Sequence, residues 1–180
     1  MNKQILYIFI SIFIFSCGSD DEGASNANNF GDFQLSLNGD LSGSKNGFAD
    51  FASMDSFGIQ TWEISLNDNN PQTLSLQFML SSATGNINRP EPGTYEIGFS
   101  ANSDSVFLAN YVNIPDGNFQ DSEEYSTFVE TYGGTLTIEA STDNIVAGSF
   151  EFTAAKEDDN FNVIGSIEVE GTFSATARQN

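Results

Sequence analysis

Two stretches decide the fold of this chain: VAGSFEFTA at residues 146–154 and IEVEGTFSATA at residues 167–177. Apolar residues or glycines occupy every second position in both, and polar residues such as Ser149 and Glu151 stand between them. A period of two residues is typical of a β-strand that buries one face and exposes the other to water. We therefore predict two half-buried strands at this end of the chain.

The same alternation recurs upstream, at residues 33–37, 62–66, 74–80 and 136–138. After the N-terminal segment no stretch shows a sustained helical period, and turn residues separate the alternating stretches. These turn pairs include Asn38-Gly39, Asn46-Gly47, Pro92-Gly93 and Asp116-Gly117. With 17 Phe, 5 Tyr and 1 Trp available for a core, we predict an all-β fold: a single antiparallel β-sandwich or barrel of roughly 8–10 short strands after a disordered tether.

The N-terminal segment has the features of a signal peptide, which we place at residues 1–16. Lys3 provides a positive charge, residues 5–15 form a largely apolar run, and Ser16 is small. The run is too short to cross a bilayer, which takes about 20 helical residues. Residues 14–17, IFSC, resemble the bacterial lipobox, in which the thiol is acylated and the preceding peptide removed. We therefore expect Cys17, the only cysteine, to carry a lipid anchor that attaches the protein to a membrane.

Acidic residues follow the cysteine directly. Asp20, Asp21 and Glu22 resemble the export signal of Bacteroidota lipoproteins that reach the outer face of the outer membrane, although they also suit a solvated linker. Residues 17–29 are then a lipidated cysteine and a flexible acidic tether, and residues 30–180 are the β domain. We expect an outer-membrane, lipid-anchored protein that faces the cell exterior.

Charge and composition exclude several classes of function. Removing residues 1–16 takes away Lys3 and no acidic residue, which leaves 4 basic against 25 acidic groups and a formal net charge of −21. This charge repels phosphate backbones and excludes nucleic acid as a partner. The chain has no histidine and no second thiol, so Ser–His, Cys–His and His-ligated metal chemistry are excluded. We expect no catalytic residue, no enzyme activity and no cofactor.

Two carboxylate-rich segments suit a hard cation, because calcium binds six to eight oxygen atoms from loops. The first contains Asp116, Asn118 and Asp121, and the second contains Asp158 and Asp159. A structural calcium ion is one interpretation of these residues. A charged hairpin turn is the alternative for the second segment, and neither segment matches the calcium loop of an EF-hand.

The segment at residues 114–130 interrupts the strand pattern. It combines turn residues with acidic residues, and long loops of this kind in compact domains are often functional. Tyr125, Phe128 and Tyr132 are candidates for an exposed contact surface. The alternative is that these rings fold back as local packing.

Several strand patterns in the C-terminal half carry a family resemblance. GTLTIE at residues 134–139, GSFEFTA at 148–154 and EGTF at 170–173, with GTY at 93–95, resemble an uncharacterised all-β domain family of Bacteroidota (Flavobacteriia-type) lipoproteins. The resemblance implies the fold and the anchor, and it assigns no functional residue. Ser105, within Asp104-Ser105-Val106, resembles the O-glycosylation site of the same phylum.

Three functions remain open. The first is a non-catalytic surface module that contacts an unidentified protein or glycan. The second is a calycin-like barrel that encloses a small apolar ligand, which a closed core of Phe78, Phe150, Phe152 and Phe173 would exclude. The third is a glycosidase that uses two carboxylates, although Glu residues at outward strand positions are more simply solubilising charges.

Overall fold

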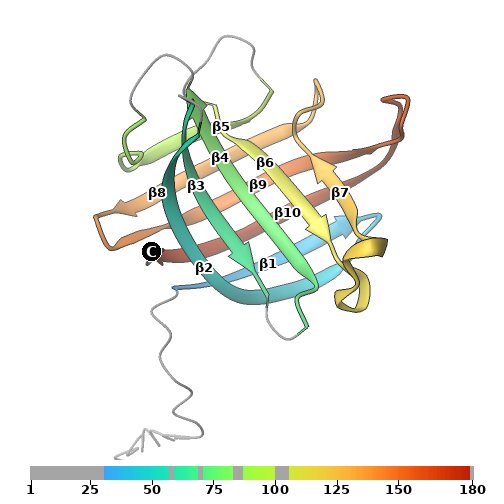
Figure 1. Cartoon of the computed structure of the whole chain (residues 1–180), viewed down its shortest axis with the longest axis horizontal. Coiled ribbons are helices and arrows are strands. Elements are labelled where there is room, and N and C mark those ends of the chain that lie inside the picture. The colour runs from blue at the N-terminus through green and yellow to red at the C-terminus, as the bar shows by residue number, and fades with distance from the viewer. Residues whose placement is uncertain (1–30, 57–58, 69–70, 83–86, 100–105, 179–180) are drawn as a thin grey trace, which may run out of the picture.

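The computed structural model describes residues 31–56, 59–68, 71–82, 87–99 and 106–178 (Figure 1), and these form an all-β fold, as predicted. Two short 3-10 helices, η1 (Pro115–Gly117) and η2 (Phe119–Asp121), accompany the strands. The ten strands are β1 (Gly31–Gly39), β2 (Gly43–Ser56), β3 (Ile59–Asn67), β4 (Leu74–Ser82), β5 (Gly93–Gly98), β6 (Leu108–Asn113), β7 (Glu123–Ser126), β8 (Gly133–Ser141), β9 (Ile145–Glu157) and β10 (Val163–Ala177).

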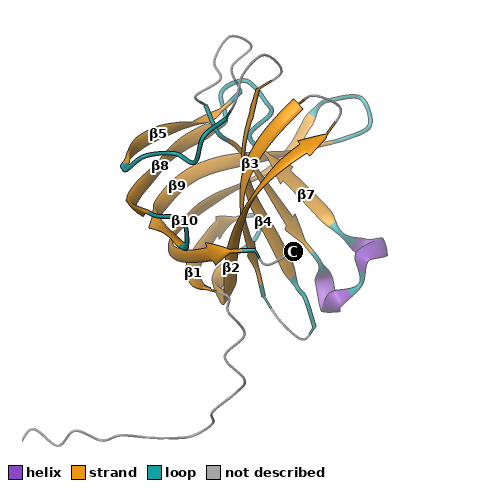
Figure 2. Ribbon diagram, turned by 60° about the vertical axis from the view of Figure 1, so that its left-hand side comes forward, coloured by secondary structure: helices purple, strands orange, loops and turns teal. Residues whose placement is uncertain are grey.

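The sheet closes on itself to form a barrel (Figure 2). A ring runs through eight strands, in the order β1, β2, β3, β4, β6, β7, β9 and β10, and β10 pairs with β1 to close it. Strands β8 and β5 extend from β9, and a bridge from Ile97 to Phe107 connects β5 to the segment before β6. Closure explains the alternation in the sequence, because every strand has an inner face and an outer face.

Glycines opposite phenylalanines let the barrel hold large rings. An added Cβ at Gly171 would lie 2.7 Å from Cζ of Phe150, and one at Gly47 would lie 2.8 Å from Cε1 of Phe33. A side chain at either position would occupy the space that the ring fills. In all, four glycines are register partners of phenylalanines on a neighbouring strand: Gly47 of Phe33, Gly171 of Phe150, Gly134 of Phe152, and Gly148 of Phe173.

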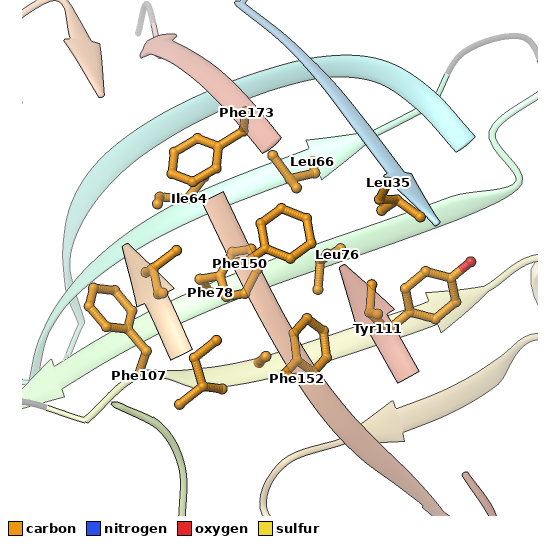
Figure 3. Packing of buried hydrophobic residues seen from close by; sticks show 14 of the residues in the cluster. Leu35, Ile64, Leu66, Leu76, Phe78, Phe107, Tyr111, Phe150, Phe152 and Phe173 are labelled. Atoms are coloured by element: carbon orange, nitrogen blue, oxygen red, sulfur yellow. The ribbon is translucent and has the colours of Figure 1, made fainter. Parts of the chain in front are cut away.

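Aromatic rings, several of them from these pairs, fill the interior of the barrel (Figure 3). The ring of Phe78 lies 4.9 Å from that of Phe150 and 5.8 Å from that of Phe152, measured between centroids. Phe173 lies 6.3 Å from Phe150, and all four side chains are buried. Aromatic rings at these separations are in direct contact. The centre of the barrel is therefore a packed core.

Two details of the predicted fold are wrong. Asn46-Gly47 was expected to be a turn but lies inside β2, where Gly47 faces the ring of Phe33. The predicted loop at residues 114–130 contains η1, η2 and the short strand β7, which pairs with β6. Four residues are too few to show a sustained alternation, so the sequence did not reveal β7.

An ion cluster of two buried carboxylates and a partly exposed arginine joins the chain after β10 to β2 and β3. The Arg178 guanidinium donates to Oδ1 of Asp50 from Nε at 2.8 Å and from Nη2 at 2.5 Å, and it lies 3.0 Å from Oε1 of Glu63. The Ser65 hydroxyl also donates to Glu63. Burial disfavours the charged guanidinium, but its hydrogen bonds to the two carboxylates outweigh burial and raise the pKa of Arg178. The cluster holds the chain after β10 against β2.

Candidate functional site

The outer face of the barrel carries a broad hollow of about 650 Å³. A second hollow of about 500 Å³ adjoins it and shares Ser36, Glu151 and Glu170. Both volumes lie within the range of ligand-binding pockets, about 300–1,000 Å³. The lining comes from β1, β2, β8, β9 and β10, and its polar side chains are Gln34, Ser36, Asn38, Ser44, Lys45, Asn46, Thr135, Thr137, Ser149, Glu151, Thr153, Glu168, Glu170 and Thr172.

Strand register arranges this polar lining in rows across the face. One row contains only uncharged side chains: Asn46, Gln34, Thr172, Ser149, Thr137 and Thr94. The next row contains three carboxylates: Ser44, Ser36, Glu170, Glu151, Thr135 and Glu96. Because register partners on one face have Cβ atoms about 5 Å apart, each row is a continuous line of hydrogen-bonding groups.

Hydrogen bonds between neighbouring strands orient part of this lining. The Ser36 hydroxyl donates to Oε1 of Glu170 at 3.0 Å, and Nδ2 of Asn38 donates to Oε2 of Glu168 at 2.8 Å. These contacts leave other carboxylate lone pairs directed outward, because an ionised carboxylate has about four acceptor positions. The hollow therefore offers fixed acceptors to a ligand that donates hydrogen bonds.

Repulsion between carboxylates in the hollow destabilises the barrel when no ligand is bound. Glu151 and Glu170 are direct register partners on adjacent strands, where like charges are destabilising. Lys45 is the basic residue of the lining, but its ammonium donates to the Thr73 hydroxyl at 2.7 Å and lies 4.0 Å from Asp68. The two carboxylates therefore face each other without Lys45 as a counterion.

The residues predicted to form a contact loop separate in the structure. Tyr125 is 2% exposed and packs against Tyr111, with ring centroids 6.4 Å apart, so including it in an exposed surface was wrong. Its strand β7 pairs with β6 and directs the ring inward. Phe128 is 60% exposed, and Tyr132 is half-buried. Only Phe128 of the three lies fully at the surface.

In the segments predicted to hold calcium, the side chains make hydrogen bonds within their own turns. Nδ2 of Asn118 donates to Asp121 at 2.5 Å, while Asp116 is exposed. Asp158 accepts backbone hydrogen bonds from Asn162 and Asn160, at 2.9 Å each. The hydrogen bonds from Asn162 are the main cause of the lowered pKa of Asp158.

Asp159 is exposed in the same turn as Asp158. Among the described residues, no group of three or more Asp, Glu, His or Cys side chains is placed to hold a metal ion. The geometry therefore gives the calcium interpretation no support in this part of the chain.

The remaining predicted sites lie outside the described residues. These are Cys17, Asp20, Asp21, Glu22 and Ser105. In the part of the chain that the structure covers, no helix has the length and apolar character needed to cross a membrane.

Sequence reasoning missed Phe99 and the hollow itself. Phe99 is 47% exposed and packs against Phe128, with ring centroids 4.7 Å apart and an interplanar angle of 64°. Nothing in its local sequence separates this phenylalanine from those in the core. The alternation in the sequence places Glu151, Glu168 and Glu170 at outward-facing strand positions, but their convergence on a hollow depends on the strand order.

Comparison of the chain with protein-family models, with curated proteins and with solved structures found no match.

Proposed function

We propose that this protein is a lipid-anchored outer-membrane lipoprotein whose β-barrel binds glycans in the hollow on its outer face. The hollow is the observation that carries the proposal. It is large enough for a ligand, and hydroxyl, amide and carboxylate groups from five strands line it.

The chemistry of the lining favours a ligand rich in hydroxyl groups. Sugar hydroxyls both donate and accept, so they suit the mixed row of Gln34, Thr172, Ser149 and Thr137. They also donate to carboxylates, which would use the outward lone pairs of Glu151 and Glu170. An apolar ligand would leave these polar groups without partners, at a cost in free energy.

The filled interior argues against the calycin-like carrier. Such a carrier needs an apolar cavity inside the barrel, whereas the rings of Phe78, Phe150, Phe152 and Phe173 contact one another there. The protein therefore has more room for a ligand on the outer face than at its centre.

The lipid anchor and the outward location rest on the sequence around Cys17. Protease accessibility on intact cells tests both. We expect the native protein to be degraded at the surface, the Cys17→Ser form to leave the membrane fraction, and the Asp20/Asp21/Glu22→Ala form to become protected. If the alanine form stays accessible, the acidic residues are only a tether.

Glycan binding is tested with the full chain purified in detergent. The probes are neutral gluco-, manno-, galacto- and xylo-oligosaccharides on an array, followed by calorimetry in solution. Ser149→Tyr places a large ring in the middle of the hollow and should abolish binding. Ser75→Tyr, at a half-buried outward position of β4, is the matched control and should bind normally. The proposal is rejected if no probe binds, or if both variants bind like the native chain.

A further inference from the structure

Two exposed phenylalanines contact each other at the surface instead of packing into the core. Phe99 follows β5 and Phe128 lies between β7 and β8, so the pair joins two separate connections of the barrel. Both rings are about half exposed or more. A pair of rings held together at the surface presents more continuous apolar area than a single exposed side chain.

The pair lies next to one end of the hollow. Gly133 lines the second hollow, and its register partner on β5 is Gly98, the residue immediately before Phe99. The other neighbour of Gly133 is Thr153 of β9, whose hydroxyl donates to the Gly133 carbonyl at 3.4 Å. The row that runs from Asn38 through Glu168 and Thr153 therefore ends at Gly133 and Gly98, one residue before Phe99.

The connection that carries Phe128 is held in place. Thr127 is completely buried, its backbone N–H donates to the Ala109 carbonyl at 3.0 Å, and its hydroxyl accepts from the Ala109 N–H at 2.9 Å. The Phe128 N–H donates to the Ser126 hydroxyl at 3.1 Å. The exposed ring therefore follows a fixed backbone, which lowers the entropy cost of binding.

We infer that Phe99 and Phe128 form an aromatic stacking subsite at the end of the hollow, and that the ligand is a neutral glycan chain of pyranose rings. This inference rests on the proposed function of the hollow. The C–H groups on one face of a pyranose ring pack against an aromatic face, while its hydroxyl groups point sideways toward acceptors. The subsite and the polar rows thus bind different parts of one kind of molecule.

Charge selects against acidic glycans. Glu151, Glu168 and Glu170 line the hollow, and the whole chain has a formal net charge of −20. Uronic acids and sulfated sugars would be repelled at this surface, with the strongest repulsion at low ionic strength. Neutral chains avoid this repulsion and still donate hydrogen bonds to the carboxylates.

The width of the hollow predicts a preference for longer chains. Its lining extends over five neighbouring strands, β8, β9, β10, β1 and β2. Four spacings of about 4.8 Å give a width of about 19 Å. This width accommodates several sugar rings, so the affinity should rise with chain length until the ligand reaches both the aromatic pair and the row that begins at Asn46.

The test compares ring removal at two exposed positions in the full chain. Phe99→Ser and Phe128→Ser should each weaken binding of the neutral oligosaccharides by about tenfold. Phe119→Ser is the matched control, because Phe119 is 64% exposed but lies in η2, before β7. Phe128→Trp should retain binding and report it by a change in fluorescence, since the native Trp62 is buried. Thermal melting of each variant shows whether it is folded.

The possible outcomes distinguish failure of the aromatic subsite from failure of glycan binding in the hollow. If Ser149→Tyr abolishes binding while Phe99→Ser and Phe128→Ser bind like the native chain, the hollow binds glycans and the aromatic subsite is wrong. If the native chain binds no neutral glycan, both proposals fail. If sulfated or uronate-containing chains bind as tightly as neutral chains, the inferred ligand class is overturned. An unchanged fluorescence of Phe128→Trp at saturating ligand also contradicts the subsite.

Discussion

Replacing Gly148 with alanine should destabilise the barrel, although glycine-to-alanine substitutions usually help or do little. An added Cβ at Gly148 would lie 1.9 Å from the Thr137 carbonyl oxygen, whereas ordinary contacts begin near 3.4 Å. Relieving this overlap would require β8 and β9 to separate locally by roughly 1.5 Å. Their hydrogen bonds would lengthen as a result.

The expected cost follows from this displacement. Overpacking of a core by one methyl group costs about 1–3 kcal/mol, and the weakened β8–β9 hydrogen bonds add about 1 kcal/mol. The lower entropy of the unfolded alanine chain returns about 0.4–1 kcal/mol. We expect a net loss of about 1–3.5 kcal/mol. For a domain of this size, the melting temperature should fall by about 2–14 °C.

Gly93→Ala is the matched control. Gly93 and Gly148 are the two register partners of Ile138, on opposite sides of β8. An added Cβ at Gly93 would meet only Cε2 of Tyr95, at 3.9 Å. This variant should be unchanged or more stable by about 0.4–1 kcal/mol. Urea unfolding followed by circular dichroism measures both variants, and equal stability of the two would refute the close approach at Gly148.

Three further predictions concern polar groups. Arg178→Gln should cost about 2–3 kcal/mol in urea unfolding at pH 7, because the buried carboxylates of Asp50 and Glu63 lose the guanidinium that pairs with them; the 34% exposure of the Arg178 side chain moderates this cost. The Tyr111 hydroxyl is buried without a hydrogen-bond partner among the described residues, so Tyr111→Phe should gain about 1 kcal/mol. Burial raises the pKa of Tyr111, so the native protein should lose stability as the pH rises above about 10, and the Phe variant should lose less in alkaline melts. The hydrogen bond that Lys156 of β9 donates to Glu123 lowers the pKa of that carboxyl. Glu123→Gln should therefore melt at a lower temperature than the native chain at pH 7, and this difference should vanish as the pH falls through the lowered pKa.

The alternation in the sequence predicts a strand well where the strand is long, one of its faces is apolar throughout and the other is mostly polar. Strand β4 is the clearest example, because Leu74, Leu76, Phe78 and Leu80 are all buried and the residues between them are not. The pattern assigns a face to each residue but does not identify the neighbouring strand. Pairing Phe150 with Gly171 required the register of β9 against β10, which depends on the whole ring.

The candidate site is less predictable than the fold for the same reason. Glu151, Glu170 and Thr135 lie on three strands, and only the strand order places them in one row. The sequence also does not predict which aromatic residues are exposed, because Tyr125 and Phe128 are three positions apart and only Tyr125 is buried. Pairing of β7 with β6 directs Tyr125 inward, and the connection to β8 leaves Phe128 outside.

The closing pair of strands also determines when the barrel can form. Asp32 of β1 pairs with Ser174 of β10, so the first and last strands in chain order must meet. Contacts between such distant positions are slow to form, because a long loop must close first. During synthesis β1 therefore has only β2 as a partner until β10 has emerged. Closure of the ring is therefore among the last steps of folding, because it waits for the final strand of the domain.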